Sequence, residues 1–504
     1  MKNIYLTTPL YYVNDKPHIG HAYTTILADV IARYHRMNGA DVFFLTGTDE
    51  HGQKVQEAAK KRNVPAHKHV DEYVKPFQQL WKRLNISHDD FIRTTEVRHT
   101  SKVKEMLMEL FKKGDIYLDE YEGLYSVSEE RFITEKEAEE GNFREIKKIK
   151  EKNYFFKMSK YQKQLIEHIQ SHPEFIKPKT RWNEVLGFLK KPLNDLCISR
   201  PKTRLSWGIE IPFDANYVTY VWFDALLNYI TAIGWGADND KFKSWWPANF
   251  HFTGKDILTT HAVYWPTMLM AAKIPLPKTI FSHGWWLMEE TKMSKSLGNI
   301  INPMELIDEY GVDSVRYYLM RDMVLGMDAN FTLESFIKRY NSDLANDYGN
   351  LVNRVTMLIN KFFNGKIPEG RNYDEIDLQI ISETKIIPQT VKNSVNELKI
   401  HDAIEQTFSI IRKVNAYLEK KSPWKTIKED DSQKGNAATT LTLSAEILRI
   451  STQLLYPIMP DKTNSILNIL GCTSIPSLNT SLEVLKPGTK LGEGKTPFPR
   501  ILIK

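Results

Sequence analysis

The feature that most constrains the fold is a strand, a loop and a helix at the start of the chain, with two histidines where the helix begins. The apolar run at residues 4–7 predicts a short buried strand, and the prolines and polar residues of 9–17 predict a loop. Apolar residues then recur at every fourth position, which predicts a helix from about Gly20 to Met37. His18 and His21 therefore lie at a helix N-terminus, where backbone N–H groups and the helix dipole favour a phosphate.

A second string, Lys292-Met293-Ser294-Lys295-Ser296, brings two ammonium groups to a segment whose serine and glycine content predicts a loop. Such a loop can close over a bound triphosphate, because imidazole N–H groups and ammoniums are suitable donors to phosphate oxygens. Each string alone has a simpler interpretation, since His18 and His21 would also cap a helix and a lysine-rich turn is usually solvated. Together, and in this order, they predict the two halves of one phosphate-binding site.

The rest of the chain predicts an α/β domain that is interrupted once and then followed by helices. A second strand at residues 41–46 precedes a loop at 47–52, which is the βαβ pattern of a parallel sheet with ligands at the strand ends. Long periodic segments at 344–363 and 438–455 indicate helices in the last part of the chain. The expected domains are a Rossmann-like catalytic domain in two halves, 1–116 and 215–330, an inserted connective domain at 117–214, and an all-α helical bundle at 331–504.

Composition limits the class of protein. With 504 residues, of which 42% are hydrophobic and 26% charged, the chain is typical of a soluble globular protein of two or three domains. The net charge of +6 is compatible with a polyanionic partner. The two cysteines, Cys197 and Cys472, indicate a reducing compartment without disulfides. No apolar run is long enough to span a membrane and the first strand begins too early for a signal peptide, so we expect a cytoplasmic protein with no membrane partner.

Longer motifs accompany the two strings. They are Leu10-Tyr11-Tyr12-Val13-Asn14, Gly47-Thr48-Asp49-Glu50-His51-Gly52, Tyr220-Val221-Trp222-Phe223-Asp224-Ala225, Thr253-Gly254-Lys255-Asp256 and Asn350-Leu351-Val352-Asn353-Arg354. With these motifs the chain resembles the methionyl-tRNA synthetases, a family of class I aminoacyl-tRNA synthetases, over essentially its whole length. The resemblance implies a ligase that forms methionyl-adenylate from L-methionine and ATP with Mg²⁺, releasing pyrophosphate. It then transfers methionine to the 3′ end of tRNA(Met), both initiator and elongator.

The same resemblance implies a methionine site. Asp49 is expected to hold the α-amino group, as a buried carboxylate can through a charge-assisted hydrogen bond. The side chain is expected in an apolar and aromatic pocket, which suits a polarizable thioether. The implied pocket residues are Leu10, Tyr12, Trp222, Ala225, Tyr229 and His283. Taken singly, Asp49 would be a helix N-cap and the aromatic residues ordinary core residues, whereas the motifs favour the binding roles.

The ATP site implied by the resemblance combines both strings with the end of a strand predicted at residues 250–253. The residues expected to bind ATP are His18, Gly20, His21, Gly254, Asp256, Lys292 and Lys295, and those expected to be catalytic are His18, His21, Lys292 and Lys295. Asp256 is assigned to the ribose hydroxyls, from which a carboxylate can accept in pairs. Lys255 and His261 are further candidates nearby. The alternative for Gly254 and Asp256 is a plain turn between a strand and a helix.

Three residues of the predicted helical domain are implied to bind the tRNA anticodon, CAU. Asn350 and Arg354 are four positions apart and so face the same way on a helix. Trp424 follows Pro423 in what we predict to be a turn. An amide, a guanidinium and an indole offer the edge hydrogen bonds and the stacking surface that unpaired bases require. Without the resemblance, the first two would be a solvated helix face and Trp424 a core residue.

The chain departs from the resemblance at one place. Many members of the family carry zinc-binding cysteines in the inserted region, but here Tyr125-Ser126-Val127-Ser128 and Gly141-Asn142-Phe143-Arg144 contain none. Cys197 and Cys472 are too few and too far apart for a tetrahedral site, so we expect no structural zinc and no protein-bound metal.

Other functions remain open at this point. The alternatives are a class I synthetase for another amino acid, a small nucleotidyltransferase, and an inactive RNA-binding paralogue. No further module follows the predicted bundle, so we expect a monomer, and the sequence does not distinguish a bacterial from an organellar origin.

Overall fold

The computed structural model divides the chain into two compact units. The first unit comprises Met1–Pro17, Asp41–Leu80 and Ser87–His283, and the second comprises His18–Ala40, Trp81–Ile86 and Gly284–Lys504. The structure describes residues 3–126, 131–133, 138, 146–288, 291–292, 301–370, 372–429, 434–472, 478–494 and 497–502. Within these residues, no helix combines the length and the hydropathy needed to cross a membrane.

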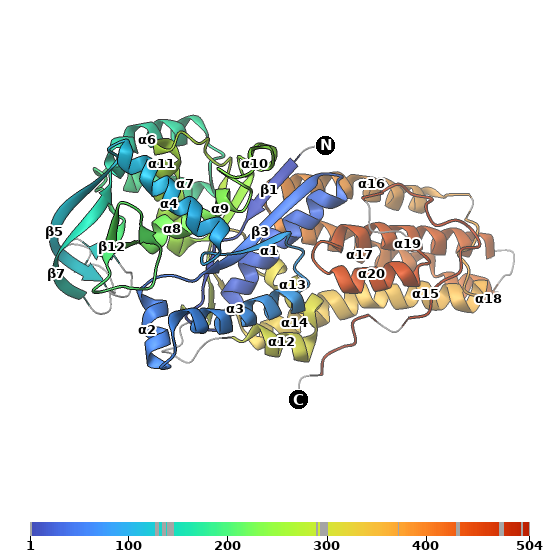
Figure 1. Cartoon of the computed structure of the whole chain (residues 1–504). Helices are drawn as coiled ribbons and strands as arrows, with labels where there is room; N and C mark the ends of the chain where they lie inside the picture. Colours follow the sequence, from blue (N-terminus) through green and yellow to red (C-terminus); the bar gives the residue numbers. More distant parts are fainter. Residues whose placement is uncertain are drawn as a thin grey trace. The chain divides into compact units, whose positions relative to one another are not determined.

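A seven-stranded sheet lies at the centre of the first unit (Figure 1). Its strands are β1 (Asn3–Thr7), β2 (Tyr11–Tyr12), β3 (Asp41–Asp49), β4 (Asp90–Arg93), β8 (Ile176–Lys177), β13 (Phe250–Gly254) and β14 (Ile280–His283). The order is β2-β3-β1-β13-β14-β8, with β4 also paired to β3, and every pairing is parallel. The parallel α/β sheet predicted from the sequence is confirmed, as are the strands at residues 4–7 and 250–253.

Strand β3 runs further than the sequence predicts. We expected a loop over residues 47–52, whereas β3 continues to Asp49. The cause is pairing on both edges, because Thr48 pairs with Arg93 of β4 on one side and with Tyr11 of β2 on the other. Gly47 is required in this stretch, since a Cβ there would lie 2.0 Å from the carbonyl oxygen of Ile92. The paired strand therefore carries Asp49 to the very end of the sheet.

Two small antiparallel sheets lie largely within the predicted insertion, residues 117–214, which also contains two helices. Their strands are β5 (Ile116–Ser126), β6 (Arg131–Ile133), β7 (Ile146–Phe156) and β9 (Leu196–Cys197) in one sheet, and β10 (Ser199–Pro201), β11 (Glu210–Ile211) and β12 (Asp214–Thr219) in the other. β5 and β7 pair along their whole length as the long ribbon in Figure 1. Strand β8, however, lies within the same range and joins the central sheet through Ile176 and Lys177.

Helices pack around the sheets of the first unit. They are α2 (Gln53–Lys61), α3 (Ala66–Arg83), α4 (Val97–Lys112), α6 (Gln162–Ser171), α7 (Lys179–Phe188), α8 (Val221–Leu226), α9 (Asn228–Thr231), α10 (Asn239–Trp245) and α11 (Trp265–Ala271), with a π-helical turn, η3 (Thr260–Tyr264), before α11. The buried core joins strand residues such as Tyr5 and Leu45 to the helix residues Leu107, Phe223 and Trp265. α8 and α9 are thereby held against this core.

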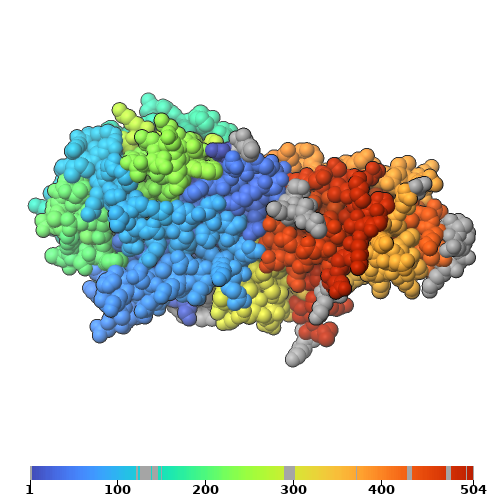
Figure 2. Space-filling view, turned by 45° about the vertical axis from the view of Figure 1, so that its right-hand side comes forward, coloured from blue at the N-terminus to red at the C-terminus, as the bar shows by residue number. Residues whose placement is uncertain are grey.

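The second unit is mostly helical. Its helices are α1 (Ile19–Met37), α12 (Pro303–Tyr310), α13 (Val312–Arg321), α14 (Leu333–Arg339), η5 (Tyr340–Gly349), α15 (Asn350–Phe363), α16 (Glu375–Asn396), α17 (Ile400–Lys421), α18 (Pro423–Glu429), α19 (Lys434–Leu455) and α20 (Pro460–Ile469). Strands β15 (Trp286–Met288), β16 (Thr291–Lys292) and β17 (Ala329–Asn330) form a small sheet. α16, α17 and α19 pack together, and the residues of this unit that follow position 300 run from yellow to red in Figure 2. The predicted helical bundle and the helix beginning near Gly20 are confirmed.

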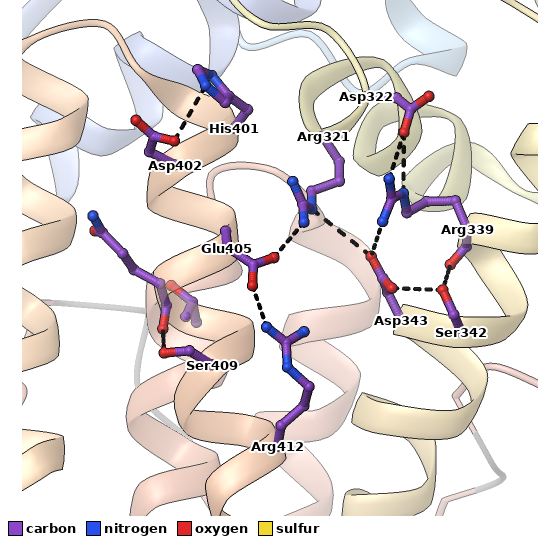
Figure 3. A network of polar contacts seen from close by, with 12 residues as sticks. Arg321, Asp322, Arg339, Ser342, Asp343, His401, Asp402, Glu405, Ser409 and Arg412 are labelled. Carbon is purple, nitrogen blue, oxygen red and sulfur yellow. Dashed lines mark hydrogen bonds and ion pairs between the residues drawn. The ribbon is translucent and has the colours of Figure 1, made fainter.

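The helix predicted over residues 344–363 is divided in the structure. Its first part belongs to η5, a ten-residue π-helix, and the α-helix begins only at Asn350. Ion pairs from neighbouring helices surround η5 (Figure 3). Asp343 of η5 lies 3.9 Å from Arg321 of α13 and 3.5 Å from Arg339 of α14. Asp347 of η5 lies 3.5 Å from Arg412 of α17. These charges hold η5 between α13 and α17, so they also position the helix that follows it.

A buried arginine joins α1 to distant segments of the second unit. Arg316 of α13 is fully buried, and its guanidinium donates to Asp29 of α1 at 2.7 Å. It also donates to the backbone carbonyls of Leu84, Pro457 and Ile458 at 2.8–3.0 Å. Because the donors of this side chain reach three different segments, removing it would leave several buried acceptors without partners. The interaction therefore anchors the helix that begins beside His18.

Candidate functional site

His18 and His21 form a reciprocal cap at the N-terminus of α1. The Nδ1 atom of His18 accepts from the backbone N–H of Gly20 at 3.1 Å, and Nδ1 of His21 accepts from the backbone N–H of His18 at 3.1 Å. The two rings lie 3.8 Å apart between centroids. Gly20 permits this geometry, because a Cβ there would lie 2.9 Å from Cε1 of His18. The helix-capping interpretation of the two histidines is confirmed.

Capping also determines which ring nitrogen carries the proton. Burial, and to a smaller extent His18, lower the pKa of His21 well below its ordinary value, so His21 is neutral near pH 7. Since Nδ1 accepts a backbone N–H in both rings, the proton of each neutral ring is on Nε2. The helix N-terminus thus offers two Nε2–H donors in addition to its backbone N–H groups. Capping and phosphate binding are therefore compatible roles for the same two side chains.

Asp49 lies at the end of β3 and is 2% exposed. Its backbone is paired with Tyr12 of β2, another residue of the predicted methionine site. The alternative role as a helix N-cap is wrong, because α2 begins at Gln53 and its N-cap is Gly52, with φ of 105°. A carboxylate buried at the end of a parallel strand is suited to hold a cationic group of a ligand.

Trp222, Ala225 and Tyr229 lie on α8 and α9. Ala225 and Tyr229 are buried and Trp222 is partly buried. The hydroxyl of Tyr229 lies 2.7 Å from Nε2 of His261, and Nδ1 of His261 donates to the carbonyl of Ile257 at 2.9 Å. Burial lowers the pKa of His261 to about 4, so the ring is neutral and its Nε2 accepts the tyrosine proton. His261, a candidate for the ATP site, thus fixes the orientation of the predicted methionine-site residue Tyr229.

Gly254 is the last residue of β13, Asp256 lies two positions further on, and His283 of β14 is the register partner of Gly254. A Cβ at residue 254 would lie 2.6 Å from Oδ1 of Asp256, so glycine allows this carboxylate to fold back over the strand end. Asp256 is exposed and His283 is buried. Gly254, Asp256 and His283 therefore lie close together in the first unit. The turn after β13 leaves Asp256 exposed.

The lysine-rich string is mostly outside the described residues. Lys292 belongs to β16, where it pairs with Leu287 through the backbone, and only this backbone is described. Residues 293–300, with Lys295, are not described. The roles of Lys292 and Lys295 remain predictions from the sequence.

The predicted anticodon residues lie together in the second unit. Arg354 of α15 places its guanidinium 5.0 Å from the ring of Trp424, and its Nη2 donates to Glu419 at 2.8 Å. Asn350 is the first residue of α15 and is exposed. The predicted turn at Trp424 is wrong, because Pro423 begins α18 and a proline fits the first turn of a helix. The ion pair with Glu419 had no indication in the sequence.

The structure thus places the candidate residues in two groups. The first unit contains Leu10, Tyr12, Asp49, Trp222, Ala225, Tyr229, Gly254, Asp256, His261 and His283, and the second contains His18, Gly20, His21, Lys292, Asn350, Arg354 and Trp424. In the described part of the chain, no three histidine, cysteine, aspartate or glutamate side chains are grouped as metal ligands. Much of the insertion around residues 127–145 lies outside that part, so the expected absence of zinc stays a prediction.

Comparison with known proteins identifies the family. A model described as class I tRNA synthetases (M) matches residues 4–142 and 140–356. A second model, described as the anticodon binding domain of methionyl tRNA ligase, matches residues 367–502. The chain belongs to the methionyl-tRNA synthetase family. The resemblance on which the sequence predictions rest is therefore confirmed, and with it the class of enzyme, a ligase of the class I synthetases.

Individual members of the methionyl-tRNA synthetase family are similar to the chain over nearly all of its length. The methionine–tRNA ligases of Listeria innocua and of Caldanaerobacter subterraneus subsp. tengcongensis are 47% and 43% identical to it. Each alignment covers 99% of this chain, and 78% and 79% of the relatives. The structure of Mycobacterium tuberculosis methionyl-tRNA synthetase in complex with methionyl-adenylate has a TM-score of 0.95 at 39% identity and covers 99% of this chain and 100% of that one. Its apo form has a TM-score of 0.88 at 36% identity, with 100% and 99% covered.

Proposed function

We propose that the protein is a methionine–tRNA ligase that activates methionine with ATP and then transfers it to tRNA(Met), initiator and elongator alike. The observation that carries the proposal is the histidine pair of α1, whose two Nε2–H groups stand at a helix N-terminus. This arrangement suits a reaction in which charge spreads over the oxygens of a transferring phosphoryl group. Membership of the methionyl-tRNA synthetase family supports methionine as the amino acid.

In the first step, the carboxylate of methionine attacks the α-phosphate of ATP and pyrophosphate leaves. His18 and His21 donate hydrogen bonds to the phosphate oxygens from Nε2, and Lys292 and Lys295 neutralise the charge of the triphosphate. Asp49 holds the methionine ammonium. Gly254 and Asp256 bind the adenosine, with Gly20 allowing close approach of the nucleotide. The side chain of methionine enters the pocket of Leu10, Tyr12, Trp222, Ala225, Tyr229 and His283.

In the second step, a terminal ribose hydroxyl of tRNA attacks the activated carbonyl and AMP leaves. Asn350, Arg354 and Trp424 bind the bases of the anticodon, by hydrogen bonds from the amide and the guanidinium and by stacking on the indole. The contact of Arg354 with Trp424 supports a shared role, since both groups are held beside each other at 5.0 Å.

We also propose the setting in which the enzyme works. ATP enters as its magnesium complex, and no residue of the chain is assigned to Mg²⁺. The protein is a cytoplasmic monomer with the four segments 1–116, 117–214, 215–330 and 331–504 as expected from the sequence. The insertion carries no zinc, because the whole chain contains only two cysteines. Metal analysis of the purified protein tests this, and about one equivalent of zinc per chain contradicts it.

Exchange of labelled pyrophosphate into ATP tests the proposed activation step. Methionine is expected to support exchange, and the other standard amino acids are not. Homocysteine lacks one methyl group, which is worth only about 1–3 kcal/mol of binding, so weak exchange with it is expected. Lys295→Ala is expected to lower the exchange rate by about 10²–10³-fold with the fold intact. Exchange supported by leucine, isoleucine, valine or cysteine instead of methionine contradicts the proposal.

A further inference from the structure

A buried carboxylate in the first unit has no part in the reaction as described so far. Asp224 lies on α8 between Trp222 and Ala225 and is 0% exposed. Its Oδ2 lies 2.6 Å from Nδ1 of His51, and its Oδ1 lies 2.7 Å from Nε2 of His99. These three residues are called the Asp224 cluster below. Each oxygen of one carboxylate thus has its own histidine partner.

The Asp224 cluster contains a fixed negative charge. Burial by itself raises the pKa of Asp224, but the two histidines outweigh that effect and the pKa lies below its ordinary value. The carboxylate is therefore ionised and accepts an N–H from each ring. Nδ1 of His99 lies 2.9 Å from the hydroxyl of Thr231 on α9, so the ring is held at both nitrogens. Charge-assisted hydrogen bonds that are buried and paired at both ends resist displacement.

The Asp224 cluster joins both parts of the proposed methionine site. His51 follows Asp49 by two positions at the end of β3, whereas Asp224 shares one short helix with Trp222 and Ala225. His99 comes from α4, which packs against α9 (Figure 1). The cluster thus ties the segment that holds the substrate ammonium to the helix that lines the pocket.

The segment that contains His51 is itself held from the other side. The indole N–H of Trp207 donates to the carbonyl of Glu50 at 2.6 Å, and its ring lies 5.4 Å from that of His51. The carboxylate of Glu50 accepts from Arg93 at 2.7 Å. His51 is consequently a rigid anchor for Asp224, rather than a side chain that follows α8 when the helix moves.

We propose that Asp224 is a positioning residue that sets the distance between the ammonium site at Asp49 and the side-chain pocket at Trp222 and Ala225. This inference rests on the proposed function, because methionine has to reach from one to the other. An amino acid with a side chain one methyl shorter or longer then fits less well. The Asp224 cluster thereby determines the selectivity for methionine over homocysteine and ethionine, although none of its three residues touches the substrate.

Replacing the carboxylate of Asp224 with a neutral amide of the same shape tests the proposal. Asp224→Asn removes the negative charge, so neither histidine bond is charge-assisted any longer, and it puts an N–H in place of one of the two acceptor oxygens. In pyrophosphate exchange, we expect the KM for methionine to rise at least about 10-fold while the KM for ATP changes less than about 2-fold. We expect kcat/KM for methionine relative to homocysteine and to ethionine to fall by about 5–10-fold. A purely structural role predicts a common loss of activity with unchanged ratios.

Two conservative histidine variants provide matched controls. His51→Asn keeps an amide N–H close to the position of Nδ1, and His99→Gln keeps one close to the position of Nε2. Both are expected to keep the selectivity ratios within about 2-fold of wild type, whereas His51→Phe and His99→Phe lose them as Asp224→Asn does. The phenylalanine variants also decide the question if Asp224→Asn does not fold.

The role of the Asp224 cluster and the ligase function are contradicted by different results. Unchanged selectivity ratios in Asp224→Asn, or in both phenylalanine variants, overturn the role of the Asp224 cluster while the ligase function stands. A wild-type protein without methionine-dependent exchange overturns the proposed function and, with it, the inference.

Discussion

His18 offers a substitution that separates helix capping from phosphate binding. In the structure, Nδ1 of His18 accepts the backbone N–H of Gly20, and its proton is on Nε2. Asparagine is among the best N-cap residues and its carboxamide oxygen can accept the same N–H, but it has no donor at the position of Nε2. His18→Asn therefore keeps the cap and removes one donor to the phosphate. His18→Ala removes both.

The loss of a phosphate donor and the loss of the helix cap differ in size. Removing one donor to a developing oxyanion costs about 10²–10³-fold in kcat, or about 2.7–4 kcal/mol. Removing an N-cap costs about 0.5–2 kcal/mol of helix stability. We therefore expect His18→Asn to lose about 10²–10³-fold in exchange rate with a stable α1, and His18→Ala to lose at least as much activity together with its cap.

Pyrophosphate exchange at saturating methionine measures the loss of activity. Amide hydrogen exchange of residues 19–22, in the first turn of α1, measures the loss of helix stability. Protection there is expected to be kept in His18→Asn and reduced in His18→Ala. An exchange rate in His18→Asn equal to that of wild type refutes the reasoning, because His18 would then be a cap and nothing more.

Three further predictions follow from the second unit. Trp424→Ala is expected to leave methionine activation unchanged and to raise the KM for tRNA about 5–150-fold, since stacking on an aromatic side chain is worth about 1–3 kcal/mol per base. An unchanged KM contradicts a role in anticodon binding. Arg316→Lys is expected to lower the free energy of unfolding by about 3–5 kcal/mol, because an ammonium cannot replace all the buried hydrogen bonds of the guanidinium. Urea titrations measure this free energy, and a loss below about 1 kcal/mol refutes the prediction. Burial raises the pKa of Asp313 to about 6, so its contribution to stability is complete below about pH 4 and is lost as the pH rises through 6. Asp313→Asn is therefore expected to raise the free energy of unfolding relative to wild type by about 2–3 kcal/mol at pH 8 and to change it little at pH 4. Equal differences between variant and wild type at pH 4 and pH 8 contradict the raised pKa of Asp313.

Elements with local causes were predictable from the sequence. The helix from about Gly20 to Met37 was placed correctly, because its apolar period and its ending at Asn38 are properties of consecutive residues. The parallel sheet was predictable for the same reason, since its strands are short apolar runs that end in motifs. The histidine cap was also predictable, as it spans only four positions.

Features that depend on distant partners were not predictable. β3 extends to Asp49 because β2 and β4 pair with it, and the pairing of strands is not visible in one segment. The π-helix η5 carries Asp343, whose ion-pair partners Arg321 and Arg339 lie on neighbouring helices (Figure 3). β8 joins the central sheet from within the expected insertion, because its two residues pair with β14.

The same distinction holds for the site. Asp49, Trp222 and Arg354 could be proposed as site residues because they lie in motifs that carry the resemblance to the family. The partners that hold them were not, because Glu419 is 65 positions from Arg354 by residue number, and Asp224 is 173 and 125 positions from its two histidines. Single motifs suggest candidate residues for the site, whereas the contacts that orient those residues come from the fold.

The central claim is most directly tested by charging tRNA. Purified protein is incubated with ATP, labelled methionine and tRNA(Met) carrying the anticodon CAU, and in parallel with the same tRNA carrying an altered anticodon. We expect acid-stable methionyl-tRNA to form rapidly with the CAU anticodon and at least about 10²-fold more slowly with the altered one, since each base contact is worth about 1–3 kcal/mol. Absence of methionyl-tRNA, or equal rates with both anticodons, contradicts the account.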